Sequence, residues 1–264
     1  MADNSRADDS RAGGPIYVLL PVHNRRAVTE KFIACLLRQT ERAFHLLLID
    51  DGSRDGTAEM VRASGVPLTV IAGRGDWWWG GSLQQGYDWL LARKREDGAM
   101  VLIMNDDTQF EPDFLDAGRA ALARSPKALL LAQAYRARSG EFLDAGVKAD
   151  WRRLQFTPVR DPAAADCLST RGLFLRLEDF LALGGFHPWL LPHYGSDYEF
   201  TARAKRRGYR LLSDPAVRRR YAILNETLCR FERATGEVGY GMHENMLMGI
   251  YRPTGFLTPD AVAP

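Results

Sequence analysis

The sequence predicts an α/β protein with a mostly parallel central sheet flanked by helices, a small antiparallel excursion and a C-terminal helical tail. In the first half, apolar runs of strand length alternate with segments of helical periodicity, which is typical of a parallel sheet covered on both faces. Two acidic clusters each come directly after such an apolar run. With 264 residues and 46% hydrophobic content, the chain can bury one sizeable core.

The elements of the first half follow from their periodicity. Residues 16–22 form a continuous apolar strand, and 27–39 have helical spacing through Phe32 and Leu36. Pro112 suits the first turn of a helix, where a missing N–H costs nothing. Further strands are expected at 44–49, 68–71, 100–104 and 128–134, and further helices at 57–63, 82–95 and 112–123.

This alternation ends after residue 134. Residues 135–166 mix short β-like pieces with glycine and proline, which predicts an antiparallel excursion. Two short helices follow, at 177–183 and 197–207, and each ends at glycine, as helices often do.

The two ends of the chain differ from the folded domain expected over residues 15–222. Residues 1–14 contain too few apolar side chains to fold and predict a disordered N-terminal arm. Residues 223–264 predict a helical extension, because Leu224, Leu228 and Phe231 have helical spacing. This tail could pack on the core, on a second copy or on a membrane surface, and core packing is favoured.

Composition restricts the class of protein. A net charge of +2 is too small to imply general nucleic-acid binding, so the basic runs 205–207 and 218–220 are interpreted as solvated faces. Three cysteines far apart predict no disulfide framework and fit a reducing compartment. No apolar run approaches the roughly 20 residues of a spanning helix. We therefore expect a cytoplasmic protein, soluble or peripheral at the inner face of the membrane.

The two acidic clusters should meet at one edge of the sheet. Residues 50–57 read Asp-Asp-Gly-Ser-Arg-Asp-Gly-Thr, and residues 105–108 read Asn-Asp-Asp-Thr. Both follow strands whose carboxyl ends form the ligand-binding edge of open α/β sheets. Crowded carboxylates there favour a divalent metal that carries nucleotide phosphates, and Mg²⁺ and Mn²⁺ both suit oxygen ligands. The alternative for the first cluster is an Asx turn with a helix cap from Asp55 or Thr57.

Two further stretches are candidates for contact with a substrate. Asp197 opens a helix and is either a cap or a general base that removes a proton from an acceptor hydroxyl. Residues 77–79 are three adjacent tryptophans, which cannot all face one core, so at least one should be exposed. Exposed indoles stack well on sugars, whereas the alternative is a loop clamp under the sheet edge.

Together, these residues resemble family 2 glycosyltransferases of the GT-A fold, which are inverting enzymes that use nucleotide-activated sugars. The resemblance covers residues 15–222. Residues 21–24 are similar to the family's Pro-x-Tyr-Asn opening with His23 as the aromatic, and residues 50–57 match its acidic motif. Residues 105–108 resemble the Asp-x-Asp region of a rhamnosyltransferase-like branch.

The resemblance implies roles for individual residues. Residues 15–134 would form the nucleotide-sugar-binding half and residues 135–222 the acceptor-binding half. Asp107 would bind Mn²⁺ or Mg²⁺, and Asp197 would be the catalytic base. The residues expected to contact the nucleotide sugar are Pro21, His23, Asn24, Asp50, Asp51, Arg74, Gly81, Gln84, Asn105 and Asp106. Those expected at the acceptor are Trp78, Trp79, Arg171, Gly172 and His193.

Three departures from the family pattern matter. Ser196 replaces the first acid of the usual Glu-Asp pair before the base. Arginines 218–220 occupy the region where many members have a metal-binding histidine. A processive Gln-x-x-Arg-Trp motif is absent from the sequence, which favours transfer of a single sugar.

The sequence therefore predicts transfer of one sugar from a dTDP- or UDP-sugar to a hydroxyl of a glycan or lipid-linked glycan, in surface polysaccharide biosynthesis. One alternative is a nucleotidyltransferase of sugar phosphates, although residues 21–26 lack the glycine-rich loop that such enzymes carry after the first strand. The other alternative is a non-catalytic nucleotide-sugar-binding scaffold, for which Ser196 and the missing metal-binding histidine are the only support.

Overall fold

The computed structural model describes residues 13–221, except 95, 137–139, 144 and 154. Most of the expected N-terminal arm and the whole C-terminal helical extension therefore lie outside the described residues. The strands are β1 (Ile16–Val22), β2 (Phe44–Asp50), β3 (Leu68–Ala72), β4 (Met100–Ile103), β5 (Thr108–Phe110), β6 (Ala128–Arg136), β7 (Val147–Asp150), β8 (Gln155–Pro158), β9 (Leu173–Arg176) and β10 (Arg210–Tyr221). The helices are α1 (Arg26–Leu37), α2 (Thr57–Ala63), α3 (Trp78–Leu91), α4 (Phe114–Ala123), α5 (Leu177–Leu183) and α6 (Ser196–Arg206), with a 3₁₀ turn at Pro162–Ala164.

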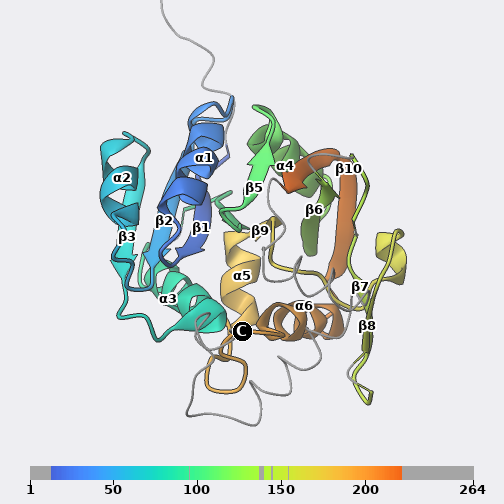
Figure 1. Cartoon of the computed structure of the whole chain (residues 1–264). Coiled ribbons are helices and arrows are strands. Elements are labelled where there is room, and N and C mark those ends of the chain that lie inside the picture. Colours follow the sequence, from blue (N-terminus) through green and yellow to red (C-terminus); the bar gives the residue numbers. More distant parts are fainter. Residues whose placement is uncertain (1–12, 95, 137–139, 144, 154, 222–264) are drawn as a thin grey trace, which may run out of the picture.

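The described strands form a central sheet of eight in the order β3-β2-β1-β4-β9-β6-β10-β5 (Figure 1). β1, β2, β3 and β4 pair in parallel, and β6 pairs in parallel with β10. β9 is antiparallel to both β4 and β6, and β5 is antiparallel to β10. The sheet is thus mostly parallel, as the sequence predicts. β7 and β8 form a separate antiparallel pair inside the expected excursion.

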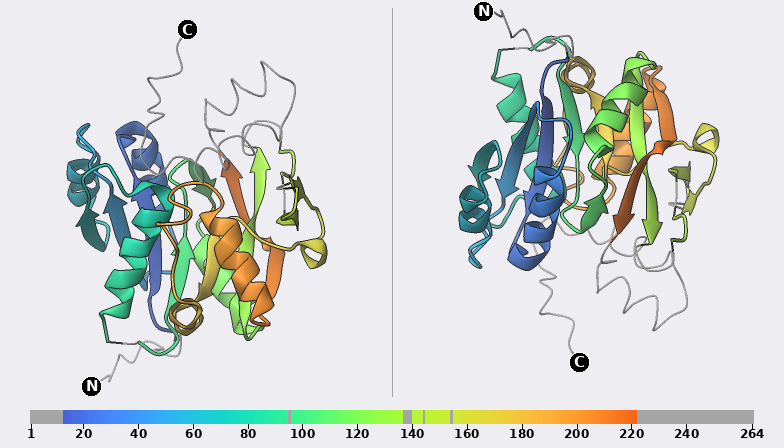
Figure 2. Two further views of the ribbon diagram at one scale, coloured as in Figure 1. Left: turned by 90° about the horizontal axis from the view of Figure 1, so that it is seen from below. Right: turned by 90° about the horizontal axis from the view of Figure 1, so that it is seen from above.

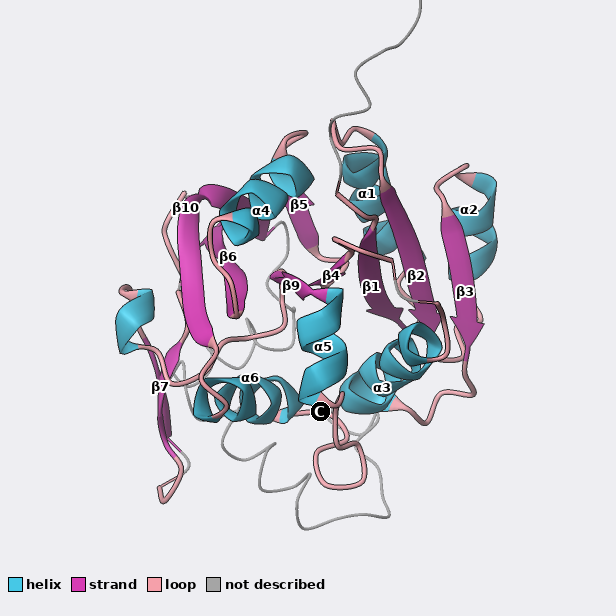
Figure 3. Cartoon of the chain, turned by 180° about the vertical axis from the view of Figure 1, so that it is seen from behind, coloured by secondary structure: helices cyan, strands magenta, loops and turns pink. Residues whose placement is uncertain are grey.

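Helices cover both faces of the sheet because successive strand residues point to opposite sides. In β1, Ile16, Val18 and Leu20 belong to a core with residues of α1, α2 and α4. Tyr17 and Leu19 face the other way, into a core with residues of α3, α5 and α6. Figure 2 shows these two sets of helices on opposite sides, and Figure 3 shows the sheet between them from behind.

Two helix boundaries differ from the prediction for identifiable reasons. α3 begins at Trp78 rather than Ser82, because the carboxylate of Asp51 accepts hydrogen bonds from the backbone N–H groups of Trp77 and Trp78. α4 begins at Phe114, so Pro112 lies before the helix instead of in its first turn. The carbonyl of Pro112 accepts hydrogen bonds from both the N–H and the hydroxyl of Thr40, at 2.8 and 3.0 Å.

Three strands of the sheet were not predicted. β5 and β9 are only three and four residues long. β10 is twelve residues long, but it carries Pro215 and a run of arginines, which obscure the strand pattern. Its pairing with β6 shifts register between Asp214 and Arg218, and a proline is tolerated at such an irregularity. In the part of the chain that is described, no helix is both long and apolar enough to cross a bilayer.

The packing of α4 on the sheet gives a stability prediction. A Cβ atom added at Gly118 would lie 2.4 Å from Cε1 of Phe174, a fully buried side chain of β9. Gly118→Val should therefore lower the free energy of unfolding by about 2 kcal/mol, within the range for overpacked cores. Urea denaturation, followed by circular dichroism, measures it.

The exposed neighbour Ala120 supplies the matched control. Ala120→Val should cost no more than about 0.7 kcal/mol, the difference in helix propensity. Equal destabilisation by the two substitutions would show that the contact between α4 and β9 does not restrict residue 118.

Candidate functional site

The loops after β1, β2 and β4 meet at one edge of the sheet because these strands are parallel and in register. Val22, the last residue of β1, lies opposite Asp50, and Leu19 lies opposite Ile103, the last residue of β4. The two acidic clusters therefore follow neighbouring strand ends. The structure thus brings them to the same edge.

The loops after β1 and β2 are tied together by their own polar side chains. His23 Nδ1 lies 2.6 Å from the carbonyl oxygen of Asp51, and Asn24 Nδ2 lies 2.9 Å from His23 Nε2. Asn24 Oδ1 accepts from the N–H of Arg54 at 2.8 Å. His23 and Asn24 remain exposed on their outer sides, whereas Pro21 is buried in β1. A ligand at this edge could therefore reach His23 and Asn24, but it could not reach Pro21.

The two aspartates at the end of β2 serve the fold directly. Asp50 Oδ1 accepts from the N–H of Ser53 at 2.8 Å, which is the expected Asx turn. The carboxylate of Asp51, 6% exposed, accepts from the backbone N–H groups of Gly75, Trp77 and Trp78 at 2.8, 2.9 and 3.1 Å. These amides lie at and before the start of α3, where a negative charge is favourable. Asp51 therefore holds the start of α3 against β2.

The cap of α2 also follows one of the alternatives considered for this cluster. Asp55 Oδ1 accepts from the N–H and hydroxyl of Thr57, the first residue of α2, at 3.1 and 2.5 Å. Its other oxygen accepts from the N–H of Arg26 at 2.9 Å, at the start of α1. One carboxylate thus ties the first turns of two helices together.

The second acidic cluster is buried beside an arginine. Asp106 and Asp107 are 5% and 8% exposed. Arg25 Nε lies 2.9 Å from Asp106 Oδ1 and 3.0 Å from Oδ2, and Thr29 donates its hydroxyl to Oδ2 at 2.9 Å. Arg25 Nη2 lies 3.6 Å from Asp107 Oδ2. Burial raises the pKa of both carboxyl groups above the ordinary range, and the charge of Arg25 opposes this shift.

Two buried oxygens of this cluster have an unused hydrogen-bonding capacity. Among the described residues, neither Asp107 Oδ1 nor Asn105 Oδ1 has a hydrogen-bond partner. Buried polar atoms are rarely left in this state, so they mark a place where a ligand or an ion could bind. Oxygen atoms of this kind suit Mg²⁺ or Mn²⁺.

These residues could hold a metal only together with ligands from elsewhere. Within the described ranges, no group of three or more His, Cys, Asp and Glu side chains is arranged around one point. The arginine run 218–220 adds no acidic or imidazole ligand, and Arg218 is exposed with its guanidinium 5.7 Å from the ring of Tyr135. Asp107 would therefore share a metal with oxygens of a bound diphosphate or water, which is usual for Mg²⁺ at nucleotide sites.

Asp197 lies in the first turn of α6, beside the loop that leads into β9. Burial raises the pKa of its carboxyl group, while the charge of Arg171 and the backbone N–H groups of Tyr198, Asp197 and Thr170 oppose this shift. The charge of Arg171 likewise opposes the rise that burial causes in the pKa of Asp107. The charge of one arginine therefore influences both carboxyl groups. The adjacent Gly172 donates its N–H to the carbonyl of Ile103 at 2.8 Å, which fixes this loop over the end of β4.

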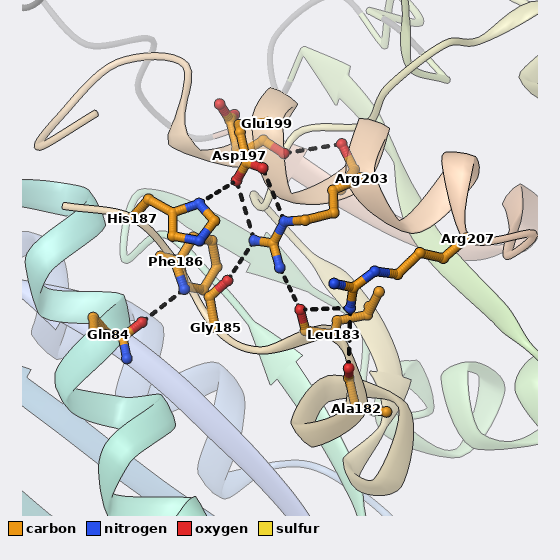
Figure 4. Close-up of polar contacts among 11 residues, drawn as sticks. Gln84, Ala182, Leu183, Gly185, Phe186, His187, Asp197, Glu199, Arg203 and Arg207 are labelled. Carbon is orange, nitrogen blue, oxygen red and sulfur yellow. Dashed lines mark hydrogen bonds and ion pairs between the residues drawn. The ribbon is translucent and has the colours of Figure 1, made fainter. Parts of the chain in front are cut away.

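A buried ionic network holds the start of α6 in place (Figure 4). Arg203, 9% exposed, pairs with Glu199 at 2.8 Å and donates to the carbonyls of Leu183 and Gly185 at the end of α5. Glu199 also lies 3.3 Å from His187 Nδ1. The last carbonyls of a helix have no partner within the helix, so an arginine from a neighbouring helix satisfies them. This network anchors the helix that carries Asp197.

The three adjacent tryptophans have different surroundings. Trp77 and Trp79 pack partly against the core on the α3 face, and Trp79 donates its indole N–H to Thr170 Oγ1 at 3.2 Å. Trp78 is 46% exposed and has φ 56°. Its ring lies 5.4 Å from that of His193, whose pKa burial lowers to about 4. Two indoles therefore pack inward, and the third faces outward as expected.

Three other residues that were expected to contact the nucleotide sugar, Gln84, Arg74 and Gly81, have different surroundings. Gln84 Oε1 accepts from the N–H of Phe186 at 2.7 Å, and its amide donates to Asp88, so it links α3 to the loop after α5. Arg74 is exposed. Gly81 is buried, and an added Cβ would lie 3.2 Å from Cβ of Trp77.

Several residues at this site were not assigned roles from the sequence. Arg25 and Thr29 hold Asp106, Thr170 contacts both Trp79 and Asp197, and Glu199 with Arg203 anchors α6. The spacing of Glu199 and Arg203, four apart on one helix, was the one available signal for a pair. The contacts of Arg25 and Thr170 join segments distant in sequence, so no local pattern indicates them.

Two hollows in the described part of the chain lie away from this site. One, of about 300 Å³, is lined by Tyr17, His45, Trp89, Arg93 and Glu96 near the opposite, amino-terminal edge of the sheet. Two of its polar side chains have partners within the protein: the Tyr17 hydroxyl donates to Glu96 at 2.7 Å, and His45 Nε2 lies 2.9 Å from Thr69 Oγ1. We therefore place the site at the carboxyl edge, where the unpartnered oxygens lie.

Comparison with known proteins identifies the family. Residues 17–176 match the family model described as Glycosyl transferase family 2, and this span is more than half of the chain. The chain belongs to glycosyl transferase family 2. No curated protein sequence matches it significantly. The rhamnosyltransferase-like branch of the family stays a prediction.

Two solved structures share the fold of this family 2 chain. GalNAc-T7, solved with UDP, GalNAc and Mn²⁺, has a TM-score of 0.65 at 14% identity, and the match covers 80% of this chain but 44% of that one. The mannosyltransferase PcManGT from Pyrobaculum calidifontis, solved with GDP-Man and Mn²⁺, has a TM-score of 0.60 at 17% identity and covers 94% and 67%. At these identities the likeness shows the fold, which is the expected GT-A fold.

The contacts of Asp51 give a prediction that separates a structural role from a ligand-binding one. Asp51→Ala leaves three backbone N–H groups without their acceptor. Because each unsatisfied buried group costs about 1–3 kcal/mol, the free energy of unfolding should fall by about 3 kcal/mol or more. Urea denaturation measures this change.

Asp76→Ala is the matched control, since Asp76 is exposed in the same loop. It should change stability by less than about 0.5 kcal/mol. If Asp51→Ala is as stable as this control, Asp51 does not hold the start of α3.

Proposed function

We propose that this protein is an inverting glycosyltransferase that moves one sugar from a dTDP- or UDP-sugar to a hydroxyl of a glycan or glycolipid, in surface polysaccharide biosynthesis. The observation that carries the proposal is the loop before β9, which joins two sites: the N–H of Gly172 donates to the carbonyl of Ile103 at the end of β4 at 2.8 Å, and the backbone N–H of Thr170 donates to Asp197. This loop therefore links the candidate base to the strand that leads into Asp107. Family membership and the GT-A fold support the same reaction class.

The donor binds at the loops after β1, β2 and β4. His23 and Asn24 offer exposed polar groups to the nucleoside, and Asn105 and Asp107 offer buried oxygens with no partner in the described part of the chain. Asp107 would hold a divalent ion, and that ion would supply positive charge to the departing diphosphate. Arg171 adds a second positive charge beside Asp107.

The acceptor binds between α3, the loop before β9 and the start of α6. The exposed face of Trp78 suits stacking on a sugar ring, the ring of His193 lies 5.4 Å from it, and Trp79 is hydrogen-bonded to Thr170 in the loop before β9. Asp197 removes the proton from the acceptor hydroxyl, whose oxygen then attacks the anomeric carbon from the face opposite the nucleoside diphosphate. A raised pKa makes this carboxylate a stronger base than an ordinary aspartate.

Binding of donor nucleotides tests the proposal first. Thermal unfolding is measured with UDP, dTDP, GDP and CDP, each with and without Mn²⁺, because a ligand of the native state raises the melting temperature. We expect a Mn²⁺-dependent rise with UDP or dTDP. Asp107→Asn should abolish the Mn²⁺-dependent part of the rise, because it removes one carboxylate charge from the site.

Asp113→Asn is the control for this experiment, since Asp113 is exposed at the start of α4. It should leave the rise unchanged. A protein that responds to none of the four nucleotides would contradict the proposal and favour a non-catalytic scaffold. Release of diphosphate from a nucleoside triphosphate and a sugar phosphate would favour a nucleotidyltransferase instead.

Asp197→Asn tests the base. Loss of a general base should lower kcat by about 100-fold or more. Stability at pH 7 should be unchanged or higher, because a carboxyl group whose pKa is raised by folding disfavours the folded state once it ionises, and asparagine stays neutral. In the unmodified enzyme, kcat/KM should rise with pH through the raised pKa of Asp197, above the ordinary aspartate value of 3.8.

The measurements are initial rates across pH, thermal unfolding and the anomeric configuration of the product by NMR. The exposed Asp161 supplies the control, and Asp161→Asn should retain full activity. An Asp197→Asn variant with full activity would remove Asp197 from this role. Retained configuration would exclude a single displacement.

A further inference from the structure

The guanidinium group of Arg25 contacts the carboxylates of both Asp106 and Asp107. Arg25 Nε is 2.9 Å from Asp106 Oδ1, and Nη2 is 3.6 Å from Asp107 Oδ2. We propose that Arg25 is a built-in counter-cation, which neutralises this pair in the metal-free protein and competes with the divalent ion for Asp107. The inference rests on the proposed function, because it takes Asp107 as the ligand of that ion.

The need for a counter-cation follows from burial. Asp106 and Asp107 are adjacent in sequence and more than nine-tenths buried, so two ionised carboxylates would repel each other away from bulk water. A buried charge is tolerated only when it is paired and hydrogen-bonded. Arg25 is the cation that contacts both carboxylates, and it therefore keeps the edge of the sheet stable before a ligand binds.

Asp106 has more contacts than Asp107, and this difference allows a metal ion to replace Arg25 at Asp107. Asp106 accepts from Arg25 on both oxygens and from the Thr29 hydroxyl on one of them. Asp107 has the longer, 3.6 Å contact to Arg25 and is influenced by the charge of Arg171, and its Oδ1 has no hydrogen-bond partner among the residues described. An arriving ion would therefore displace Arg25 from Asp107 at little cost and leave Asp106 in place.

The side chain of Arg25 can move while its backbone stays fixed. The carbonyl of Arg25 accepts from the N–H groups of Val28 and Thr29 at 3.0 and 2.9 Å, which begins α1. The next N–H, of Arg26, is held by Asp55 at 2.9 Å. By contrast, the side chain of Arg25 is 35% exposed, so solvent reaches it from outside the site. Exchange on Asp107 therefore requires only a change of rotamer.

The test compares Arg25→Gln with Arg26→Gln, an exposed neighbour with the same charge. Binding of Mn²⁺ alone, without nucleotide, is measured by titration calorimetry and by the loss of the free Mn²⁺ signal in electron paramagnetic resonance. Arg25→Gln should bind Mn²⁺ about tenfold more tightly than the unmodified protein, a change of about 1.4 kcal/mol. Arg26→Gln should bind as the unmodified protein does, and Asp107→Asn added to Arg25→Gln should remove the gain.

Thermal unfolding gives a second readout that does not depend on activity. In the presence of EDTA, Arg25→Gln should melt at a lower temperature than the unmodified protein, and Mn²⁺ should reduce this difference. If Arg25→Gln does not fold, Arg25→Lys keeps the charge but loses the two-carboxylate geometry, and it should bind Mn²⁺ more tightly by a smaller factor.

If Arg25→Gln binds Mn²⁺ as tightly as Arg26→Gln or more weakly, Arg25 does not compete with the metal ion, and the proposed counter-cation role is wrong. The nucleotide experiment on the unmodified protein keeps the two proposals apart. A Mn²⁺-dependent response to UDP or dTDP would uphold the donor site even where Arg25→Gln gains no affinity for the metal.

Discussion

The structure at the carboxyl edge of the sheet depends on compensating the charge of four buried aspartates. Each is compensated in a different way. Asp50 closes a turn, Asp51 accepts amides at the start of α3, and Asp106 is held by Arg25 and Thr29. Asp107 alone among them keeps a buried oxygen without a partner in the described residues. The fold thus engages three of these carboxylates in hydrogen bonds through one or both of their oxygens, whereas Asp107 keeps an oxygen that no described group contacts by a hydrogen bond.

The second requirement is to hold the start of α6, which carries Asp197, against the end of β4, which leads into Asp107. α6 carries Asp197 and comes almost 100 residues after the strand that precedes Asp107. Glu199 and Arg203 fix the start of α6 to the carbonyls at the end of α5, while Gly172 fixes the preceding loop to the end of β4. Arg171 lies in that loop and acts on both carboxylates. Positioning in this site therefore comes from polar contacts between elements, made where water is largely excluded.

Local patterns predicted most of the regular structure, and the errors have physical causes. Residues 57–63 and 177–183 were predicted with the boundaries that α2 and α5 have, because apolar periodicity and glycine stops mark them. The predicted start of α3 was wrong. The backbone N–H groups of Trp77 and Trp78 donate to Asp51, which follows β2, and no local pattern indicates this contact. β10 was missed because its arginines and Pro215 are tolerated by long-range pairing with β6, which overrides a weak local propensity.

The sequence by itself determined the family, the mostly parallel sheet and the edge at which the acidic clusters meet, because the alternation of strands with helices and the spacing of the motifs are local patterns. It left open which carboxylates the fold uses and which remain for a ligand. Only the tertiary structure decided that Asp51 serves α3, that Gln84 links α3 to the loop after α5, and that Arg25 sits on Asp106 and Asp107. The physical reason is that compensation of a buried charge depends on groups brought together by folding: Asp51 and Gly75 lie 24 residues apart in the chain, and Arg25 and Asp106 lie 81 residues apart.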